Sequence, residues 1–427
     1  MLLTIALALS ALSAAAAPLT TSFDVSGVQV ILRQNAANNV VAANLYLLGG
    51  ARQVTEANAG IEPILLDVSE RGTQHYPRNA LRRAMSRLGS EIVIRAAADW
   101  TMFGLRSSTE VFDSTWAIFA DRVMRPSLGS ADVNLVKARY LSGIRQRRDD
   151  PDELASLLAD SITLAGHPYS VSVVGNEKSI QALDSAALRE YHRKEFVTSR
   201  MLLVVVGNVD RAHIERLVNQ SLGKLPAGSY KWTLPPRVPE RETAFVIERR
   251  QLPTNYIIGY YSGPLATGED YRALRVATSV LTGRMFAEIR SRQNLTYDVH
   301  APFIDRAATV GGLYVSTASP DTTLKLMRSA INDLQTGLLD PVGLKQMEQQ
   351  FITEYFLDNE TNAAQADFLA RAQLYEGDYR AADRFVSDLR NVTPEAVQRV
   401  ARRYMKGFRF AYVGDPSKLK PGTFALF

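Results

Sequence analysis

The chain has 427 residues, of which 46% are hydrophobic, so it is long enough to form two domains with packed cores. Its formal net charge is only +5, and the basic run from Arg145 to Arg148 is followed at once by Asp149 and Asp150, which argues against nucleic-acid binding. The sequence has no cysteine, which excludes disulfides, thiolate metal sites and cysteine nucleophiles.

The first 17 residues form an apolar stretch that is shorter than a membrane span and ends in small residues, as a secretory signal peptide does. We expect cleavage near Ala15 to Ala17, which leaves a periplasmic or secreted mature chain without a stable membrane span. The stretch contains no Lys or Arg, and Pro18 follows it. An uncleaved anchor and an incorrectly assigned start are therefore the alternatives.

In the first half of the chain, the apolar pattern predicts the order strand, strand, helix, helix, strand, strand, followed by further helices. The ranges are, in chain order, 28–33, 40–48, 60–69, 79–88, 91–95 and 100–106. The last two strands flank Ala97, Ala98 and Asp99, which indicates a hairpin.

The second half repeats this kind of pattern. Its predicted strands are 244–248, 256–261 and 311–317, and its predicted helices are 271–281 and 284–292. Together the two halves indicate an α+β layout in which each sheet carries packed helices.

An internal repeat supports two homologous halves. An apolar strand that ends at Gly207 has a counterpart that ends at Gly414, and each strand follows a predicted helix. Thr393 before Pro394 is a helix-start signal, because the hydroxyl caps the helix and proline has no amide to leave unpaired. We predict domains at 18–227 and 241–427, joined by a proline-rich linker at 228–240 that crosses on the surface.

The segment from Gly60 to Thr73 resembles the zinc motif of pitrilysin-type (M16) peptidases, Gly-x-x-His-x-x-Glu-His-x-x-x-x-Gly-Thr. The two histidine positions hold Pro63 and Asp67, the general-base position holds Leu66, and the position of the third ligand, a glutamate, falls on Gly143. Proline, leucine and glycine side chains cannot bind zinc or accept a proton from its water. The resemblance therefore implies a family member whose own zinc motif is degenerate.

Weaker fragments extend the resemblance over nearly the whole chain after residue 20. They include Leu88-Gly89-Ser90, the run from Arg147 to Pro151, and Gly166-His167-Pro168-Tyr169. The resemblance implies an α+β fold of two homologous M16-type (LuxS/MPP-like) domains, each a mainly antiparallel sheet packed by helices.

A replacement metal site would have to recruit histidines from elsewhere in the chain. No two of them have ligand spacing on a helix, so we expect each to be structural, with His167 packing a loop. The histidines are His75, His167, His192, His213 and His300. No cofactor is expected in this chain.

The second half keeps a motif that the first half lacks. The segment 285–297 resembles Leu-Phe-x-Glu-x-Arg-x-x-x-Gly-Leu-x-Tyr, in which the family's Arg and Tyr reach over the zinc from the opposite domain. Here those positions are Arg290 and Tyr297. A guanidinium can hold peptide carbonyls, and a phenol can donate to an oxyanion. Asn294 replaces the usual glycine, a mild change because asparagine tolerates a left-handed turn.

This asymmetry favours one function over two alternatives. The chain is similar to the non-catalytic, substrate-binding subunit of a heterodimeric M16 zinc peptidase, which implies that Arg290 and Tyr297 act in trans. The expected partner carries an intact His-x-x-Glu-His motif with the zinc, and the substrate is a peptide or unfolded polypeptide. One alternative is a structural or peptide-binding M16-like protein without a role in catalysis. The other is a self-sufficient enzyme, for which no Ser/His/Asp or Ser/Lys arrangement is visible in the sequence.

Overall fold

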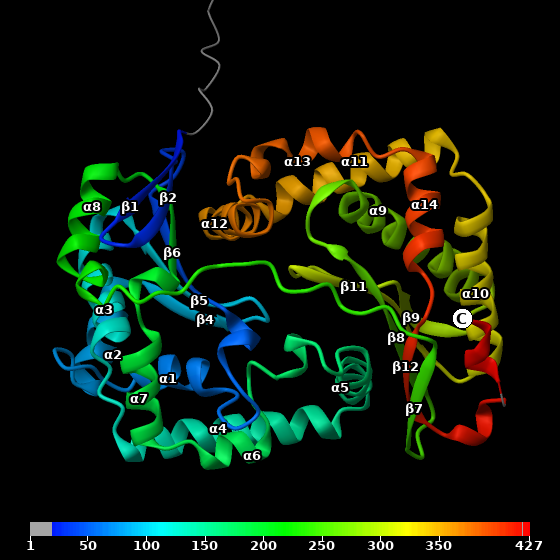
Figure 1. Ribbon diagram of the computed structural model, residues 1–427, viewed down its shortest axis with the longest axis horizontal. Helices are drawn as coiled ribbons and strands as arrows, with labels where there is room; N and C mark the ends of the chain where they lie inside the picture. The colour runs from blue at the N-terminus through cyan, green and yellow to red at the C-terminus, as the bar shows by residue number, and fades with distance from the viewer. Residues whose placement is uncertain (1–18, 421) are drawn as a thin grey trace, which may run out of the picture.

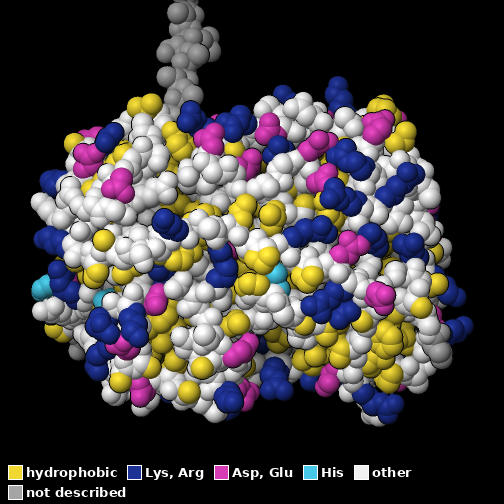
Figure 2. Space-filling view, viewed as in Figure 1, with side chains coloured by type: hydrophobic (Ala, Val, Ile, Leu, Met, Phe, Trp, Pro, Cys, Tyr) yellow, Lys and Arg dark blue, Asp and Glu magenta, His cyan; other side chains and the backbone are white. Residues whose placement is uncertain are grey.

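The computed structural model of the protein describes residues 19–420 and 422–427, and it shows two α+β domains side by side (Figure 1). The expected signal peptide, residues 1–17, lies outside the described residues. Acidic and basic side chains are interspersed over the face shown in Figure 2. Within the described residues, no helix combines the length and the apolar content needed to cross a membrane.

The first domain is built on a six-stranded sheet in the order β1-β2-β6-β3-β5-β4. β2 and β6 run parallel, and the other neighbours run antiparallel. The hairpin of β4 and β5 confirms the sequence prediction. The strands are β1 (Thr20–Val25), β2 (Val28–Gln34), β3 (Val40–Leu48), β4 (Glu91–Ala96), β5 (Trp100–Ser108) and β6 (Met201–Gly207).

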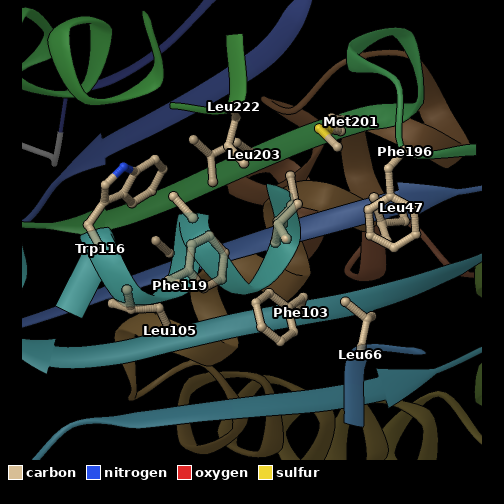
Figure 3. Packing of buried hydrophobic residues seen from close by; sticks show 14 of the residues in the cluster. Leu47, Leu66, Phe103, Leu105, Trp116, Phe119, Phe196, Met201, Leu203 and Leu222 are labelled. Atoms are coloured by element: carbon tan, nitrogen blue, oxygen red, sulfur yellow. The ribbon is translucent and has the colours of Figure 1, made fainter. Parts of the chain in front are cut away.

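Helices pack one face of this sheet and enclose the first hydrophobic core (Figure 3). Phe103 on β5 stacks on Phe119, with ring centroids 4.8 Å apart. The helices of the first domain, not all of which pack on its own sheet, are α1 (Ile61–Ser69), α2 (Arg78–Leu88), α3 (Phe112–Met124), α4 (Ser130–Asp149), α5 (Pro151–Thr163), α6 (Glu177–Ala182), α7 (Ser185–Glu195) and α8 (Arg211–Gln220). Short 3-10 turns are η1 (Gly50–Gln53), η2 (Thr109–Val111), η3 (Pro168–Ser170), η4 (Thr198–Arg200) and η5 (Leu222–Lys224).

The second domain has a sheet in the order β10-β11-β8-β12-β7, with β9 also paired to β11. β12 and β7 run parallel, and the other pairs run antiparallel. The strands are β7 (Ala244–Arg249), β8 (Asn255–Leu265), β9 (Thr296–His300), β10 (Phe303–Ile304), β11 (Ala308–Thr317) and β12 (Arg409–Gly414).

The helices of the second domain are more numerous in its C-terminal part. They are α9 (Gly268–Met285), α10 (Pro320–Thr336), α11 (Pro341–Asp358), α12 (Asn362–Arg371), α13 (Ala381–Leu389) and α14 (Pro394–Tyr404). Two π-helical turns, η6 (Phe286–Arg292) and η7 (Ala372–Glu376), extend α9 and α12, and 3-10 turns η8 (Pro416–Lys418) and η9 (Thr423–Leu426) follow β12. Thr393 caps α14 through the amide of Ala396, as the sequence predicts.

The strand order confirms the internal repeat. Strands β2-β6-β3-β5 of the first sheet correspond to β7-β12-β8-β11 of the second, with the parallel pair at the same place. Gly207 and Gly414 end the equivalent strands β6 and β12. A Cβ at Gly207 would lie 2.9 Å from the carbonyl oxygen of Val40, and one at Gly414 would lie 2.3 Å from Oδ1 of Asn255, so both positions require glycine.

The two domains exchange helices. α12 of the second domain packs on β3 and β6 of the first, while α5 of the first domain packs on β8 and β12 of the second (Figure 1). Apolar residues from both domains therefore form two shared clusters, one under each exchanged helix. Each sheet thus has one face covered by a helix of the other domain, and this burial joins the two domains.

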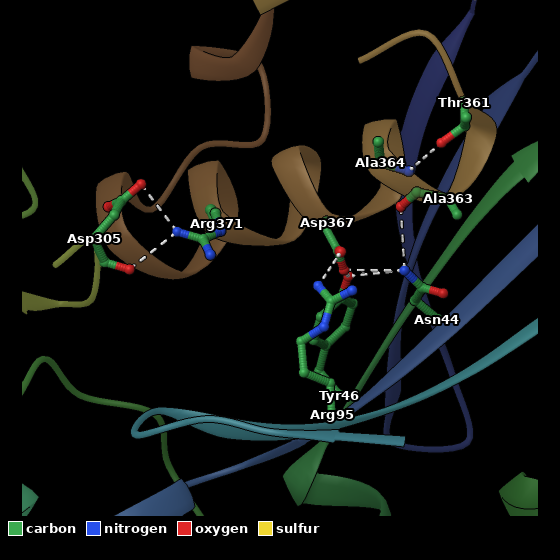
Figure 4. A network of polar contacts seen from close by, with 9 residues as sticks. All are labelled: Asn44, Tyr46, Arg95, Asp305, Thr361, Ala363, Ala364, Asp367 and Arg371. Atoms are coloured by element: carbon green, nitrogen blue, oxygen red, sulfur yellow. Dashed lines mark hydrogen bonds and ion pairs between the residues drawn. The ribbon is translucent and has the colours of Figure 1, made fainter. Parts of the chain in front are cut away.

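Polar contacts fix α12 on the first sheet. The Asp367 carboxylate accepts hydrogen bonds from the phenol of Tyr46 and from Nδ2 of Asn44, the latter at 3.1 Å, and it pairs with Arg95 at 3.1 Å (Figure 4). One turn further along, Arg371 pairs with Asp305 at 3.0 Å. The Asp367 contacts set the register of α12 on β3, whereas the Arg371–Asp305 pair holds α12 to a loop of its own domain.

Two sequence predictions need correction. Residues 271–281 and 284–292 do not form separate helices, because α9 runs through Gly283 directly into η6. Burial of Leu281 and Met285 in the same core outweighs the low helix propensity of glycine.

The linker also differs from its prediction. Residues 228–240 have no regular secondary structure, and most of them are exposed as predicted, but the segment is anchored at a few points. Nε1 of Trp232 donates to the carbonyl of Leu374 at 2.7 Å, and Val238 is buried. The aromatic and aliphatic side chains of the segment anchor it between the domains, because their burial removes apolar area from water.

Candidate functional site

The degenerate zinc motif lies where α1 packs against α4. Gly60 begins α1 in a left-handed conformation (φ 87°). Pro63 and Leu66 are buried, and Leu66 extends from α1 towards Phe103 in the core (Figure 3). On α4, a Cβ at Gly143 would meet no atom within 4 Å. The helix pair is thus preserved, while Pro63 and Leu66 are apolar, Gly143 has no side chain, and Asp67 alone keeps a group that could bind a metal.

Asp67, the remaining acidic group of the motif, is held by α4. The phenol of Tyr140 donates to its carboxylate at 2.6 Å, and Arg139 pairs with it at 2.9 Å. Burial, together with the charge of Asp67, raises the pKa of the Tyr140 phenol well above its ordinary value, so Tyr140 stays a donor. Asp67 therefore has the partners of a structural carboxylate.

Arg122 on α3 holds the C-terminal end of α1 by hydrogen bonds. Its guanidinium donates to Oγ of Ser69 at 3.0 Å and to the carbonyl of Leu66 at 3.2 Å. Burial lowers the pKa of Arg122 to about 10, and the nearby acidic residues Glu70 and Asp67 only partly offset that effect. Arg122 remains charged at neutral pH and stabilises the carboxyl end of the helix.

The histidines have separate local partners. His75 faces Asp121, His192 faces the carbonyl of Val123, and His213 faces Asp113, at 2.6–2.8 Å. His300 lies 3.3 Å from Asp298 and stacks on a tyrosine ring. Among residues 19–420 and 422–427, no three His, Cys, Asp or Glu side chains are grouped so that they could hold a metal.

His167 packs a loop, as the sequence predicts. It is buried, its Nε2 lies 2.8 Å from the carbonyl oxygen of Pro236, and its Nδ1 accepts the amide of Tyr169. Burial lowers the pKa of His167, so the ring is neutral at pH 7.

The structure brings Arg290 and Tyr297 together. The guanidinium carbon of Arg290 lies 5.0 Å from the ring centroid of Tyr297 and 4.9 Å from that of Phe286. Tyr297 is 83% exposed. Glu288, which could have neutralised Arg290, instead pairs with Arg292 at 2.7 Å. Within the described chain, Arg290 has no carboxylate partner.

A π-helical turn produces this arrangement. In η6 the amide of Gln293 donates to the carbonyl of Glu288, five residues earlier, and the amide of Leu295 donates to Ile289. Asn294 has φ 51°, so it adopts the left-handed conformation expected of the residue that replaces glycine. The wide turn carries the chain into β9, where Tyr297 lies beside Arg290.

Sequence analysis identifies Arg290 and Tyr297 but not the role of Phe286. Phe286 is 43% exposed, and its ring covers Arg290. Phe286 lies four residues before Arg290 in the predicted helix 284–292, and side chains at this spacing lie on the same helix face. This spacing could have predicted their contact. Cation–π contact holds a guanidinium while leaving its N–H groups free.

Comparisons with known proteins agree with this description. Residues 29–176 match a family model described as insulinase (peptidase family M16), and residues 182–351 match one described as the peptidase M16 inactive domain. The chain is 24% identical over 409 residues to an uncharacterized zinc protease of Mycobacterium tuberculosis, covering 92% of each chain.

Two solved structures share the fold. One is a peptidase M16 inactive domain from Pseudomonas fluorescens, with TM-score 0.85 and 18% identity over 93% of this chain and 98% of that one. The other is a protease from Helicobacter pylori, with TM-score 0.84 and 16% identity over 93% of this chain and 99% of that one. At these identities the likeness concerns the fold.

Proposed function

Because this chain belongs to the peptidase M16 family, we propose that it is the non-catalytic, substrate-binding subunit of a heterodimeric zinc peptidase. One observation carries the proposal: Arg290 and the exposed Tyr297 are adjacent and free of local carboxylates, on a chain whose own zinc positions cannot bind zinc. A guanidinium already paired within its own domain would be a poor ligand for a substrate carbonyl.

The proposed partner is an M16 subunit with an intact His-x-x-Glu-His motif. Its zinc would supply an activated water for attack on the peptide bond. This chain would supply half of the enclosure around a peptide or unfolded polypeptide. We also propose that the chain acts in the periplasm or outside the cell.

The two side chains have different tasks in this proposal. The N–H groups of Arg290 hold a carbonyl of the bound peptide, which orients the substrate before reaction. The Tyr297 phenol donates to the oxyanion that develops on the attacked carbonyl, so its contact strengthens in the transition state. Phe286 positions Arg290.

Reconstitution tests the proposal. The chain and an M16 subunit with the intact motif from the same source are assayed on a quenched fluorescent peptide, separately and mixed. We expect hydrolysis only from the mixture. If the motif-bearing subunit is equally active alone, the chain is instead a structural or peptide-binding protein without a role in catalysis.

A further inference from the structure

The two sheets end differently at equivalent edges. In the first domain, β1 pairs with the outer edge of β2 along its whole length, from Thr20 opposite Arg33 to Val25 opposite Val28. β7 is the counterpart of β2 in the second domain, and it is the last strand of its sheet in the described part of the chain. A sheet edge of this kind presents unpaired N–H and C=O groups.

The middle of the β7 edge exposes apolar side chains. Phe245 and Ile247 on β7 are 56% and 37% exposed, and Leu426 in η9 is 44% exposed. Phe245 stacks on Phe424 of η9, with ring centroids 5.1 Å apart. Figure 2 shows an apolar patch at the lower right, over the region where Figure 1 places β7 and the C-terminal segment. Glu248 and Arg249 at the end of β7 are exposed and charged, whereas Phe245 and Ile247 leave the middle of the edge apolar. An exposed apolar patch rimmed by polar residues is typical of an interaction site.

We propose that β7 pairs with β7 of a second copy of the chain. The two strands run antiparallel about a two-fold axis, with Val246 opposite Val246 of the second copy. The pairing joins the second-domain sheets of two copies into one continuous sheet. Its two-fold symmetry is the commonest symmetry of homo-oligomers.

The backbone restricts the possible registers. The amide of Ala244 donates to Phe408 and that of Arg250 donates to Gly414, both on β12. Alternate residues of a strand bond to the same neighbour, so the even-numbered residues of β7 face β12 and the odd-numbered residues face outward. Antiparallel partners must both face outward or both face inward. Only registers that pair odd with odd and even with even numbers remain.

Side chains select among these registers. With Val246 on the axis, Phe245 lies opposite Ile247 of the second copy, so apolar residues meet apolar ones on both sides of the axis. Just outside β7, Glu242 lies opposite Arg250, but the Arg250 guanidinium already donates to the carbonyls of Arg148 and Asp149, so this charge pair adds little.

The neighbouring registers are less favourable. With Phe245 on the axis, Arg241 would lie opposite Arg249 and Glu242 opposite Glu248, so like charges would meet twice. With Ile247 on the axis, Phe245 would lie opposite Arg249. The strand is therefore self-complementary in one antiparallel register.

The proposed contact is compatible with the Arg290 and Tyr297 site. β7 and β9 lie at opposite edges of the second sheet, so pairing at β7 leaves Tyr297 exposed. A contact made by one short strand and a small flanking patch is below the area of a stable interface, so we expect a weak dimer that dissociates on dilution.

Sedimentation velocity at a series of chain concentrations tests the dimer. We expect the wild-type chain to shift from monomer to dimer as concentration rises, and the Ile247→Lys variant to remain monomeric at every concentration. Arg249→Lys, which keeps the charge on the same strand, is the control and should dimerise like wild type. A wild-type chain that stays monomeric, or an Ile247→Lys variant that dimerises equally, overturns the proposal.

The absence of cysteine makes the register directly testable. Under mild oxidation, Val246→Cys should form a disulfide-linked dimer, because facing residues of a non-hydrogen-bonded pair have Cα atoms about 4.5 Å apart. Ile247→Cys should cross-link far more slowly, because in this register it faces Phe245 and not itself. Equal cross-linking of the two variants contradicts the register.

A different occupant would give a different result. If the chain is monomeric and Ile247→Lys weakens its binding to reduced, carboxymethylated casein as a model unfolded polypeptide, the edge binds substrate as an added strand. That outcome also overturns the proposed dimer.

Discussion

The guanidinium of Arg290 stacks on the ring of Tyr297 at 5.0 Å, and the ring of Phe286 lies 4.9 Å from the same guanidinium. No hydrogen bond or ion pair with another described residue occupies the N–H groups of Arg290, so they remain available for a carbonyl. This is the part of the structure that the proposed function uses.

Arg290→Ala should raise KM and lower kcat in the reconstituted complex, since the peptide would use the guanidinium before and during reaction. Arg290→Lys should be nearly as harmful, because an ammonium lacks the planar fork that stacks between two rings. Arg380→Ala is the matched control, because Arg380 is also in the second domain, is exposed and pairs with Asp378. Michaelis curves that are equal for the Arg290 and Arg380 variants would count against a role for Arg290.

The chain alone should bind no stoichiometric zinc. Pro63, Leu66 and Gly143 offer no donor, and Asp67 is already held by Tyr140 and Arg139. Elemental analysis after dialysis is the measurement. About one tightly held zinc per chain would show that a site exists elsewhere.

Glu62→Ala should lower the free energy of unfolding by about 3 kcal/mol, because it removes the nearer and more buried of the two carboxylates that pair with the Arg200 guanidinium and leaves only Glu195, at 3.7 Å. The Glu62 carboxylate and the guanidinium lie 2.9 Å apart, and both are almost fully buried. The measurement is urea denaturation. Glu190→Ala removes an exposed acidic group from the neighbouring helix α7 and should leave the denaturation midpoint unchanged. Similar midpoints for both variants would rule out this role of Glu62.

Asp99→Ala should weaken the contact between the domains. Asp99 is buried in the first domain, and its carboxylate accepts the phenol of Tyr375 and the amide of Ala307 from the second domain, each at 2.9 Å. Loss of the carboxylate leaves both donors unsatisfied, at a cost of about 3 kcal/mol.

We expect urea denaturation of Asp99→Ala to show a lower midpoint and loss of a single cooperative transition. Asp113→Ala, which removes a half-exposed carboxylate within the first domain, serves as control. A single transition at the wild-type midpoint would show that Asp99 does not couple the domains.

Local features of the fold could be predicted from the sequence. The strands that end at Gly207 and Gly414 are nearly continuous apolar runs, and glycine is required where each strand meets a neighbour. Thr393 before Pro394 specified a helix start, because capping depends on residues next to one another. Such signals lie within a few residues of the structure that they determine.

Features that depend on distant contacts could not be predicted. The placement of α5 and α12 on the opposite domains follows from which sheet face remains uncovered, and a single helix carries no signal for that choice. Likewise, the π-helical turn at η6 and the burial of Trp232 arise from packing between segments far apart in the chain. Strand β1, whose residues are only half buried, also gave no clear pattern.

The candidate site was predictable in part. Arg290 and Tyr297 could be placed by their spacing, but the stack of Phe286 on Arg290 required the structure. At the degenerate motif, the sequence shows which ligands are missing. It does not show that Tyr140 and Arg139 hold the remaining carboxylate, because α1 and α4 are separated by some 60 residues of chain.

The kcat of the Tyr297→Phe variant, measured in the complex with the motif-bearing subunit, most directly tests whether this chain acts in trans. The substitution removes one hydroxyl from an exposed ring and should not disturb the fold. Tyr76→Phe, a half-exposed position in the first domain, is the matched control and should have wild-type kinetics. We predict that Tyr297→Phe lowers kcat by about 10²- to 10³-fold with little change in KM, because the lost hydrogen bond forms mainly in the transition state. Wild-type kcat for Tyr297→Phe would contradict the proposed role.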